Sequence, residues 1–223
     1  MRPTRIRASD PKRGIVSTLS LIKKRVQSDL PSVSEIAQSS SDPFKILVST
    51  IISLRTKDEV TLAASTRLFE RAPDSASLSE LPTDEIERLI FPCGFYHTKA
   101  GQIKHVAEVV AKQGMPRTRE GLLRFPGIGP KTANLTLGLG FGEPCICVDI
   151  HVHRIANRLG WVQTRTPEAT ELALEAVVPR RLWIGLNGTL VVFGRKICTP
   201  VSPHCSDCPV NSLCPRSGVT RSR

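Results

Sequence analysis

The hydrophobic positions of this 223-residue chain recur mainly at helical spacing. Residues 16–30 and 98–113 each place apolar side chains on one face, and the strongly apolar segment 43–54 predicts a buried helix. Another long helix is predicted over residues 181–197. Runs of β-branched residues are short and only 4% of the residues are aromatic, so a large sheet is not expected. The pattern predicts an all-α protein of about ten helices.

Capping residues mark several predicted helix starts. Asp58 is a predicted N-cap of a helix that runs towards Arg71, and Thr83 is a predicted cap of another helix. The segment Ser77–Glu80 has the spacing of a capping box. Thr166–Glu168 combines a capping hydroxyl, a proline and an acid, and therefore predicts a helix start. The polar and basic residues from 215 onward predict a frayed end.

The chain is basic, with a formal net charge of +11 from 31 Lys+Arg and 20 Asp+Glu. This excess suits nucleic acid, because Lys and Arg replace the counterions condensed on it. A basic protein without such a partner is the plain alternative. No apolar stretch reaches the length of a membrane span, and no apolar signal-peptide core follows the basic residues 1–7. We therefore expect no membrane contact and an intracellular location, in the cytoplasm or nucleoid if the host is bacterial.

Two glycines that flank one apolar residue, Gly127-Ile128-Gly129, predict a tight turn between two helices. Glycine permits a positive φ and lets the backbone approach a partner closely. Pro130 suits the first position of the second helix, whose outward-facing amides can bind a phosphate oxygen. Ile128 would then anchor the turn in the core. An ordinary turn between helices is the alternative that this short pattern leaves open.

Lys131 and Asp149 are the candidate catalytic residues. Lys131 falls near the second position of the new helix, where the positive end of the helix dipole favours a neutral, nucleophilic amine. Such an amine can attack a sugar carbon and form a Schiff base. Asp149 can deprotonate the attacking group or stabilise positive charge on the deoxyribose ring. The alternatives are a phosphate contact for Lys131 and an N-cap role for Asp149.

A group of cysteines near the end of the chain predicts a metal centre. The four members are separated by six, two and five residues: Cys198, Cys205, Cys208 and Cys214. Thiolate ligation of a 4Fe–4S cluster fits one close pair with an outlying cysteine on each side. Zinc is the alternative, although zinc sites usually show two close pairs. The other three cysteines lie in apolar surroundings and are predicted to be buried thiols: Cys93, Cys145 and Cys147.

Taken together, these segments resemble a known family, the endonuclease III DNA glycosylases of the helix-hairpin-helix superfamily. Phe125–Asn134 resembles the family's hairpin with its catalytic lysine, and Val148–Arg158 resembles the segment with its catalytic aspartate. The cysteine spacing matches the family's 4Fe–4S loop. The resemblance extends from about Asp42 to Pro215. It implies that Lys131 and Asp149 are catalytic and that the four cysteines hold a structural 4Fe–4S cluster.

The resemblance also implies a fold and a reaction. The fold is a two-domain, all-α helix-hairpin-helix glycosylase fold with a C-terminal 4Fe–4S cluster loop. Residues 33–143 would form a six-helix barrel with the hairpin, and residues 1–32 plus 144–223 a discontinuous cluster domain. The two catalytic residues would face each other across the cleft between the domains. The implied enzyme, expected to be a monomer, removes oxidised pyrimidines from duplex DNA after base flipping and cleaves the abasic site by β-elimination.

Several further residues are expected at the DNA surface. Arg55 stands where family members often carry a glutamine, which leaves the lesion and opposite-base preference open, and a phosphate contact is its alternative. Phe95 lies where the family inserts an apolar wedge into DNA, with a place in the core as its alternative. DNA contacts are also expected from the following residues: Gly127, Ile128, Gly129, Thr132 and His151.

Two other functions stay open from the sequence. The first is a monofunctional mismatch glycosylase of the same superfamily, although such relatives commonly lack a lysine at the position of Lys131. The second is a non-catalytic iron–sulfur protein that binds DNA and senses damage. Strand cleavage without added alkali separates the lyase from the first alternative, and any turnover separates it from the second.

Overall fold

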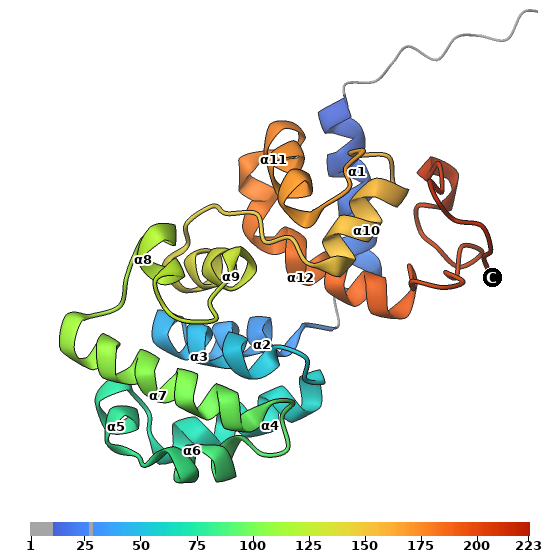
Figure 1. The fold of residues 1–223 in the computed structure, drawn as a ribbon. Coiled ribbons are helices and arrows are strands. Elements are labelled where there is room, and N and C mark those ends of the chain that lie inside the picture. The colour runs from blue at the N-terminus through green and yellow to red at the C-terminus, as the bar shows by residue number, and fades with distance from the viewer. Residues whose placement is uncertain (1–10, 27–28) are drawn as a thin grey trace, which may run out of the picture. The chain divides into compact units, whose positions relative to one another are not determined.

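The structure, a computed structural model, describes residues 11–26 and 29–223. Within those residues the chain forms twelve α-helices and two short 3-10 helices without any strand, which confirms the all-α prediction (Figure 1). The helices group into two compact units. One unit is the continuous segment Pro31–Cys145, and the other combines the described residues up to Leu30 with Ile146–Arg223. No helix in the described part of the chain has the length and apolar character needed to cross a membrane.

Eight helices form the continuous unit: α2 (Ser32–Ser39), α3 (Pro43–Ser53), α4 (Asp58–Arg71), α5 (Ser75–Glu80), α6 (Thr83–Ile90), α7 (Tyr96–Gln113), α8 (Arg119–Leu123) and α9 (Pro130–Phe141). Helix α3 is the centre of this unit and packs against α2, α4, α7 and α9 (Figure 1). Its side chains are apolar almost all round, and Ile46, Leu47 and Ile51 are completely buried. A helix that is hydrophobic on all sides is expected in the core of a bundle, so the pattern of segment 43–54 explains this position.

The second unit joins the start of the described chain to its end: α1 (Pro11–Val26), α10 (Ile150–Arg158), α11 (Pro167–Val177), η1 (Arg180–Leu182), α12 (Trp183–Lys196) and η2 (Asn211–Leu213). Helix α12 packs against both α1 and α10, and α11 packs against α10. Ile22 of α1 and Phe193 of α12 are buried in the shared core. Thr166 caps α11 by accepting a hydrogen bond from Ala169 N, which confirms the start predicted there.

Three predicted caps are wrong in detail. Asp58 and Thr83 are each the first helical residue and not the N-cap. The Asp58 carboxylate accepts a hydrogen bond from Ser32 Oγ at 3.1 Å instead of capping its own helix. The capping box also exists, but it joins Asp74 to Ser77 at the start of α5, three residues before the predicted one. In each case the sequence locates the helix but not its first residue.

The end of the chain is packed, and the prediction of a frayed tail is wrong. Arg223 N donates to Pro203 O at 2.8 Å, and Ser206 N donates to Arg223 O at 3.0 Å. The Arg216 guanidinium donates to Asn211 Oδ1 at 2.6 Å. Hydrogen bonds, which a polar composition does not reveal, therefore hold this segment against the cysteine loop.

Candidate active site and cysteine loop

The predicted hairpin lies between α8 and α9. Gly127 has a φ of +75°, and a Cβ at this position would lie 1.8 Å from the Gln102 Nε2, which donates to Pro126 O. Ile128 is 6% exposed and belongs to the core, as the pattern predicts. Gly129, in contrast, has an ordinary negative φ and nothing within 4 Å of a built Cβ. The turn is therefore tightly packed on the side of Gly127 and open on the side of Gly129.

Lys131 occupies the first turn of α9. Pro130 is the first residue of this helix and Gly129 is its N-cap, and there is no acidic residue in the first turn. The partial positive charge of a helix N-terminus is therefore not neutralised by a local carboxylate, which suits a phosphate group. Lys131 is half-buried, and Thr132 is only 3% exposed. A DNA contact from Thr132 would consequently come from its backbone amide and not from its hydroxyl.

Asp149 is the N-cap of α10. Its Oδ1 accepts hydrogen bonds from His151 N and Val152 N, both at 2.9 Å, which confirms the capping role. A carboxylate held by two backbone amides keeps one orientation, and this also suits a residue that acts on a substrate. Asp149 and Lys131 belong to different units, so their meeting over a substrate stays a prediction. His151, half-buried in the first turn of α10, has its Nδ1 3.2 Å from Arg154 Nη2.

Arg55 and Phe95 lie together on two neighbouring loops of the continuous unit. The Arg55 Cζ is 5.3 Å from the centroid of the Phe95 ring. Phe95 is 61% exposed, which rules out its alternative place in the core. Both residues adopt a positive φ, 53° for Arg55 and 60° for Phe95, a conformation that costs side-chain-bearing residues about 1–2 kcal/mol. Such strain persists where the surrounding structure enforces it, and it is common at functional sites.

Lys99 lies beneath these two loops, and the sequence pattern did not mark it. It is 4% exposed, and its Nζ donates to Ile52 O at 2.7 Å, Leu54 O at 2.6 Å and Thr56 Oγ1 at 2.9 Å. Burial lowers the pKa of Lys99 from its ordinary value. One feature of the sequence indicates that Lys99 is buried: it stands four residues before Ile103, on the apolar face of α7. A lysine at such a position is buried only if its ammonium group is fully hydrogen-bonded.

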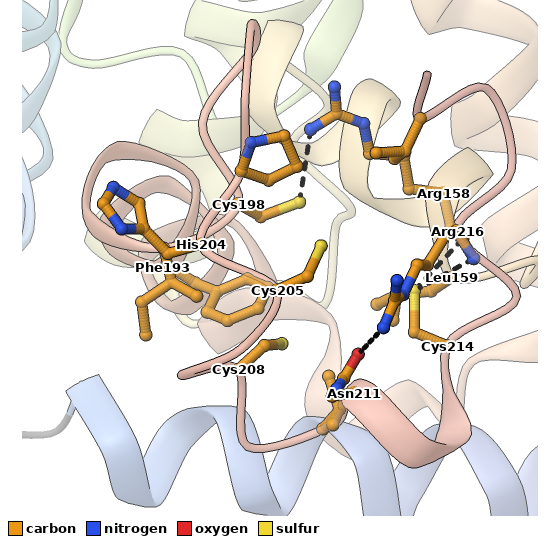
Figure 2. Close-up of a pocket in the computed structure, with 14 residues that line it drawn as sticks. Arg158, Leu159, Phe193, Cys198, His204, Cys205, Cys208, Asn211, Cys214 and Arg216 are labelled. Carbon is orange, nitrogen blue, oxygen red and sulfur yellow. Dashed lines mark hydrogen bonds between the residues drawn. The ribbon is translucent and has the colours of Figure 1, made fainter. Parts of the chain in front are cut away.

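The four clustered cysteines line one pocket in the second unit. Figure 2 shows their sulfur atoms around a common space between the end of α12 and η2. Leu159, Phe193 and Val210 supply apolar walls. Among the described residues, no three His, Cys, Asp or Glu side chains are grouped as they would be around a single ion. Four thiols spread around one apolar-walled pocket fit a 4Fe–4S cluster, whose irons are each bound by one thiolate.

Hydrogen-bond donors surround these sulfur atoms. Arg158 Nη1 lies 3.5 Å from Cys198 Sγ, and Arg216 N lies 3.3 Å from Cys214 Sγ (Figure 2). Burial raises the pKa of the Cys208 and Cys214 thiols above their ordinary value, so a positively charged partner is needed to hold them as thiolates. N–H donors to cluster sulfurs are a usual means of stabilising reduced, negatively charged clusters.

Helix α10 is fixed to the cysteine loop by two arginines. Arg154 donates to Gly194 O at 3.0 Å and to Cys198 O at 2.9 Å. Arg158 donates to Thr199 O and to Pro200 O and is only 9% exposed. The helix that Asp149 caps is thus hydrogen-bonded to the backbone around the first cysteine of the loop. Neither arginine stands out in the sequence, because an arginine on a short amphipathic helix normally faces solvent.

The three remaining cysteines do not line the pocket. Cys93 and Cys147 are buried, as predicted, while Cys145 is half-buried. Burial raises the pKa of the Cys93 thiol, so it stays protonated at neutral pH. These thiols therefore serve as apolar packing groups and not as ligands.

Two comparisons of sequence identify the segments described above. Residues 48–180 match the HhH-GPD superfamily of base excision DNA repair proteins, and residues 198–214 match the iron–sulfur binding domain of endonuclease III. The first match covers the hairpin, Lys131 and Asp149, and the second begins at Cys198 and ends at Cys214. The zinc alternative is therefore wrong, because the loop is of the iron–sulfur type.

Relatives of known name agree with these matches. Endonuclease III of Thermotoga maritima is 46% identical over 78% of this chain and 83% of its own length. Endonuclease III homolog 2, chloroplastic, of Arabidopsis thaliana is 41% identical over 77% of this chain, which corresponds to 48% of that protein. The chain thus spans most of the bacterial relative and about half the length of the plant relative.

Solved structures show the same fold. A trapped endonuclease III–DNA covalent intermediate superposes with a TM-score of 0.77 at 28% identity, covering 92% of this chain and 96% of that one. A thermostable thymine-DNA glycosylase superposes with a TM-score of 0.79 at 27% identity, covering 92% of this chain and 96% of that one. An endonuclease III and a thymine-DNA glycosylase are therefore both structural neighbours of this chain.

Proposed function

The chain belongs to the endonuclease III family of base excision repair enzymes, bifunctional DNA glycosylases and abasic-site lyases with a 4Fe–4S cluster, and we propose that Lys131 is its nucleophile. The observation that carries this proposal is the position of Lys131, one residue into α9 and directly after the open glycine turn. A phosphate bound by the turn and the helix N-terminus would hold the adjacent sugar within reach of the lysine amine. The covalent protein–DNA intermediate trapped for a related endonuclease III supports an attacking side chain of this kind.

The proposed reaction has two chemical stages. The Lys131 Nζ attacks C1′ of the flipped nucleotide, the bond from C1′ to the base nitrogen breaks, and the base leaves with a proton. The ammonium group formed at C1′ then loses one proton. The C1′–O4′ bond breaks, O4′ takes up a proton, and the nitrogen electron pair forms the second Nζ–C1′ bond of a protonated imine that keeps the remaining hydrogen on Nζ. Removal of a C2′ proton next breaks the C3′–O3′ bond and releases the 3′ phosphate. Water finally hydrolyses the imine and returns the free amine of Lys131.

Asp149 is proposed to assist both stages from its capping position. Its carboxylate can accept a proton from the Lys131 ammonium group, which leaves the neutral amine that attacks, and it can stabilise the positive charge that develops on the sugar ring. The two amide donors at 2.9 Å keep this carboxylate oriented before the substrate binds. The proposal requires the two units to bring Asp149 to the same sugar as Lys131.

The proposed substrate is duplex DNA with an oxidised pyrimidine or an abasic site. Gly127, Gly129 and the amide of Thr132 would contact the backbone, with Ile128 anchoring the turn from within the core. Arg55 and Phe95 would enter the duplex where the nucleotide has left, and His151 would contact DNA near Asp149. The net charge of +11 supports a polyanionic partner of this kind.

The two units support an assignment of domains. We assign the continuous unit to the helix-hairpin-helix barrel domain and the other unit to the cluster domain. The cluster would be held by Cys198, Cys205, Cys208 and Cys214, and its chemistry when bound is structural, because the cut needs no electron transfer. We further propose that the enzyme acts as a monomer inside the cell, where its DNA substrate is.

Borohydride trapping tests the nucleophile directly, because borohydride reduces an imine to a stable amine. Wild-type enzyme with an abasic duplex should give a covalent complex, and Lys131→Ala should give none. Lys112→Ala, which removes an exposed lysine from the last turn of α7, is the matched control and should trap like the wild type. Equal trapping by Lys131→Ala would overturn the assignment.

A thymine-DNA glycosylase is a structural neighbour of this chain, so the mismatch alternative is tested by comparing activity on different lesions. Single-lesion duplexes with thymine glycol, dihydrouracil, uracil or a thymine–guanine mismatch would rank the substrates. A lyase that prefers oxidised pyrimidines cleaves the strand without added alkali. Base release from the thymine–guanine duplex alone, without strand cleavage, would favour the mismatch enzyme. Absence of turnover on every duplex would favour the damage sensor.

A further inference from the structure

Two exposed loops of the continuous unit are joined through one buried amine. The first loop follows α3 and carries Arg55, and the second precedes α7 and carries Phe95. We propose that Lys99 is the positioning residue that holds Arg55 and Phe95 in register, and that it thereby sets how the enzyme discriminates the base opposite the lesion. This inference rests on the proposed function, in which Arg55 and Phe95 enter the duplex.

The side chain of Lys99 holds the loop that carries Arg55. An ammonium group has three donors, and all three are used here, on Ile52 O, Leu54 O and Thr56 Oγ1. These acceptors lie on both sides of Arg55. The two carbonyls also stand at the C-terminal end of α3, where the helix dipole favours a cation. A helix often ends at a glycine that has a positive φ. At the end of α3 the residue with a positive φ is Arg55, and the hydrogen bonds from the Lys99 ammonium group to the Ile52 and Leu54 carbonyls stabilise this helix end.

The backbone of Lys99 holds the loop that carries Phe95. Lys99 N donates to Phe95 O at 3.0 Å, and this bond closes the first turn of α7. Phe95 is the N-cap of that helix and has a left-handed conformation without a side-chain cap. The same residue thus fixes the backbone of Phe95 through its amide and the backbone around Arg55 through its amine.

Thr56 and Gly94 complete the connection between the loops. Thr56 Oγ1 accepts hydrogen bonds from Lys99 Nζ and from Gly94 N at 3.1 Å, and it lies 3.2 Å from Leu54 O. A Cβ on residue 94 would lie 2.6 Å from Arg55 O, so the two backbones are in close contact. With this support, the left-handed conformations of Arg55 and Phe95 can persist without DNA. A small shift of Lys99 would move both exposed side chains together.

The buried position of Lys99 makes a direct DNA contact unnecessary for its effect. Its side chain is 4% exposed, and its three donors are already used, so it is not a phosphate-binding lysine. We therefore expect its loss to change affinity and base discrimination for lesion duplexes, while the chemical step of Lys131 on a single-stranded abasic substrate is unchanged. This pattern separates positioning of the two loops from general damage to the fold.

The test substitutes Lys99→Met, which keeps the length of the side chain and removes the three donors. We expect the Kd for a lesion duplex to rise about tenfold, the preference between opposite bases to fall about tenfold, and borohydride trapping on single-stranded abasic DNA to stay within about twofold. Lys104→Met is the matched control, because Lys104 lies on the same helix and donates to the Ser79 carbonyl away from the two loops. It should behave as the wild type in all three measurements.

A mutant cycle identifies the route of the effect. In an Arg55→Ala, Phe95→Ala background, Lys99→Met should change the opposite-base preference no further, because both side chains through which it acts are already absent. The fluorescence of 2-aminopurine placed opposite the lesion reports directly on how that base is held. It should change in Lys99→Met as it does in Arg55→Ala. A full additional loss in the combined variant would overturn the inference.

A second variant covers the case in which Lys99→Met does not fold. Thr56→Val keeps the volume of the side chain and removes the oxygen that joins Lys99 to Gly94, and it should lower discrimination in the same direction. If the variant that folds binds lesion duplexes and discriminates opposite bases like the wild type, the inference about Lys99 is overturned. The proposed function still stands in that case, provided that borohydride traps the wild-type enzyme through Lys131. Absence of trapping by the wild-type enzyme itself would instead overturn the proposed function. The two failures are therefore distinguishable.

Discussion

The guanidinium of Arg55 lies over the ring of Phe95, with 5.3 Å between Cζ and the ring centroid, and both residues have a positive φ. Each of these residues adopts a conformation that glycine would adopt more easily. A chain under selection for stability alone has no reason to keep two long side chains there. Their projection from adjoining loops is therefore best explained by what the side chains do outside the protein.

Phe95→Gly separates stability from function at this position. The free energy of unfolding should stay within about 1 kcal/mol of the wild type, because relief of the left-handed conformation offsets the lost ring contact. Affinity for a lesion duplex should fall at least about tenfold, because the wedge is missing. Phe125→Ala is the contrasting variant. Phe125 is 5% exposed, and its loss should cost about 3–5 kcal/mol by denaturant unfolding.

Substitution of the two hairpin glycines should give opposite results. Gly127→Ala places a Cβ 1.8 Å from Gln102 Nε2 at a φ of +75° and should destabilise the protein by about 1–3 kcal/mol. Gly129→Ala meets nothing within 4 Å and should leave thermal unfolding nearly unchanged. If the open side of the turn approaches DNA, Gly129→Ala should still weaken duplex binding, measured by fluorescence anisotropy. Wild-type binding by Gly129→Ala would place the phosphate contact elsewhere.

Two substitutions of Asp149 divide its capping role from its proposed chemical role. Asp149→Asn keeps an oxygen that can accept from His151 N and Val152 N, so the free energy of unfolding should change by less than about 1 kcal/mol. Its single-turnover rate should nevertheless fall about 100-fold, because the charge is gone. Asp149→Ala should lose both the capping hydrogen bonds and the single-turnover activity, and its free energy of unfolding should fall by about 1–2 kcal/mol. A fully active Asp149→Asn would leave Asp149 as a cap alone.

Loss of one ligand should be visible in the iron content. Cys208→Ala should lower the iron content from about four atoms per chain and remove the visible absorbance. The free energy of unfolding should fall with it, because metal binding contributes to folding. Cys145→Ala is the control, since Cys145 does not line the pocket, and it should retain its iron. Equal iron in both variants would contradict the assigned ligands.

Lys99 should also leave a signature in the pH dependence of stability. Burial lowers its pKa in the folded protein from the ordinary 10.5, so between the two values the unfolded chain holds a proton that the folded chain has released. The contribution of Lys99 to the free energy of unfolding therefore rises with pH in this window and is constant below it. The contribution of the buried Cys93 thiol to the free energy of unfolding falls as the pH rises, because its pKa in the folded protein is raised above 9.0.

The measurement compares denaturant unfolding across the alkaline range in a Cys93→Ala background, with and without Lys99→Met. The protein that keeps Lys99 should gain stability with rising pH relative to the Lys99→Met protein. Parallel curves for the two proteins would show that the ammonium group is as well solvated in the folded state as in the unfolded state.

Sequence periodicity predicted the all-α fold well because most helices here have one apolar face or are apolar throughout. It predicted the helix starts at Asp149 and Thr166, where side-chain caps and prolines mark them. It misplaced the starts near Asp58 and Thr83 by one residue, because these helices begin after Lys57 and Pro82, which make no side-chain capping hydrogen bond. The hairpin and the cysteine loop could be predicted because their residues are consecutive or evenly spaced along the chain.

The supporting residues could not be predicted in the same way. Lys99 reaches acceptors 43 to 47 positions earlier in the chain, and Arg154 reaches a carbonyl 44 positions later. Contacts of this range depend on which helices pack together, and single-sequence periodicity does not contain that information. Asp149, whose capping partners are local, was therefore predicted from the sequence, whereas Lys99 and Arg154, which join distant segments, required the structure.

The division of the chain into a continuous and an interrupted unit has a consequence for biosynthesis. The segment Pro31–Cys145 forms one compact unit from consecutive residues, so we expect it to fold while the ribosome is still translating the remainder. Helix α1 is translated before α12, against which it packs, and the four pocket cysteines are translated after α12. If these cysteines bind the cluster, as proposed, the cluster can be inserted only after α12 has been translated. Until α12 has been translated, the apolar face of α1 is exposed to solvent. At this stage the nascent chain most needs a chaperone.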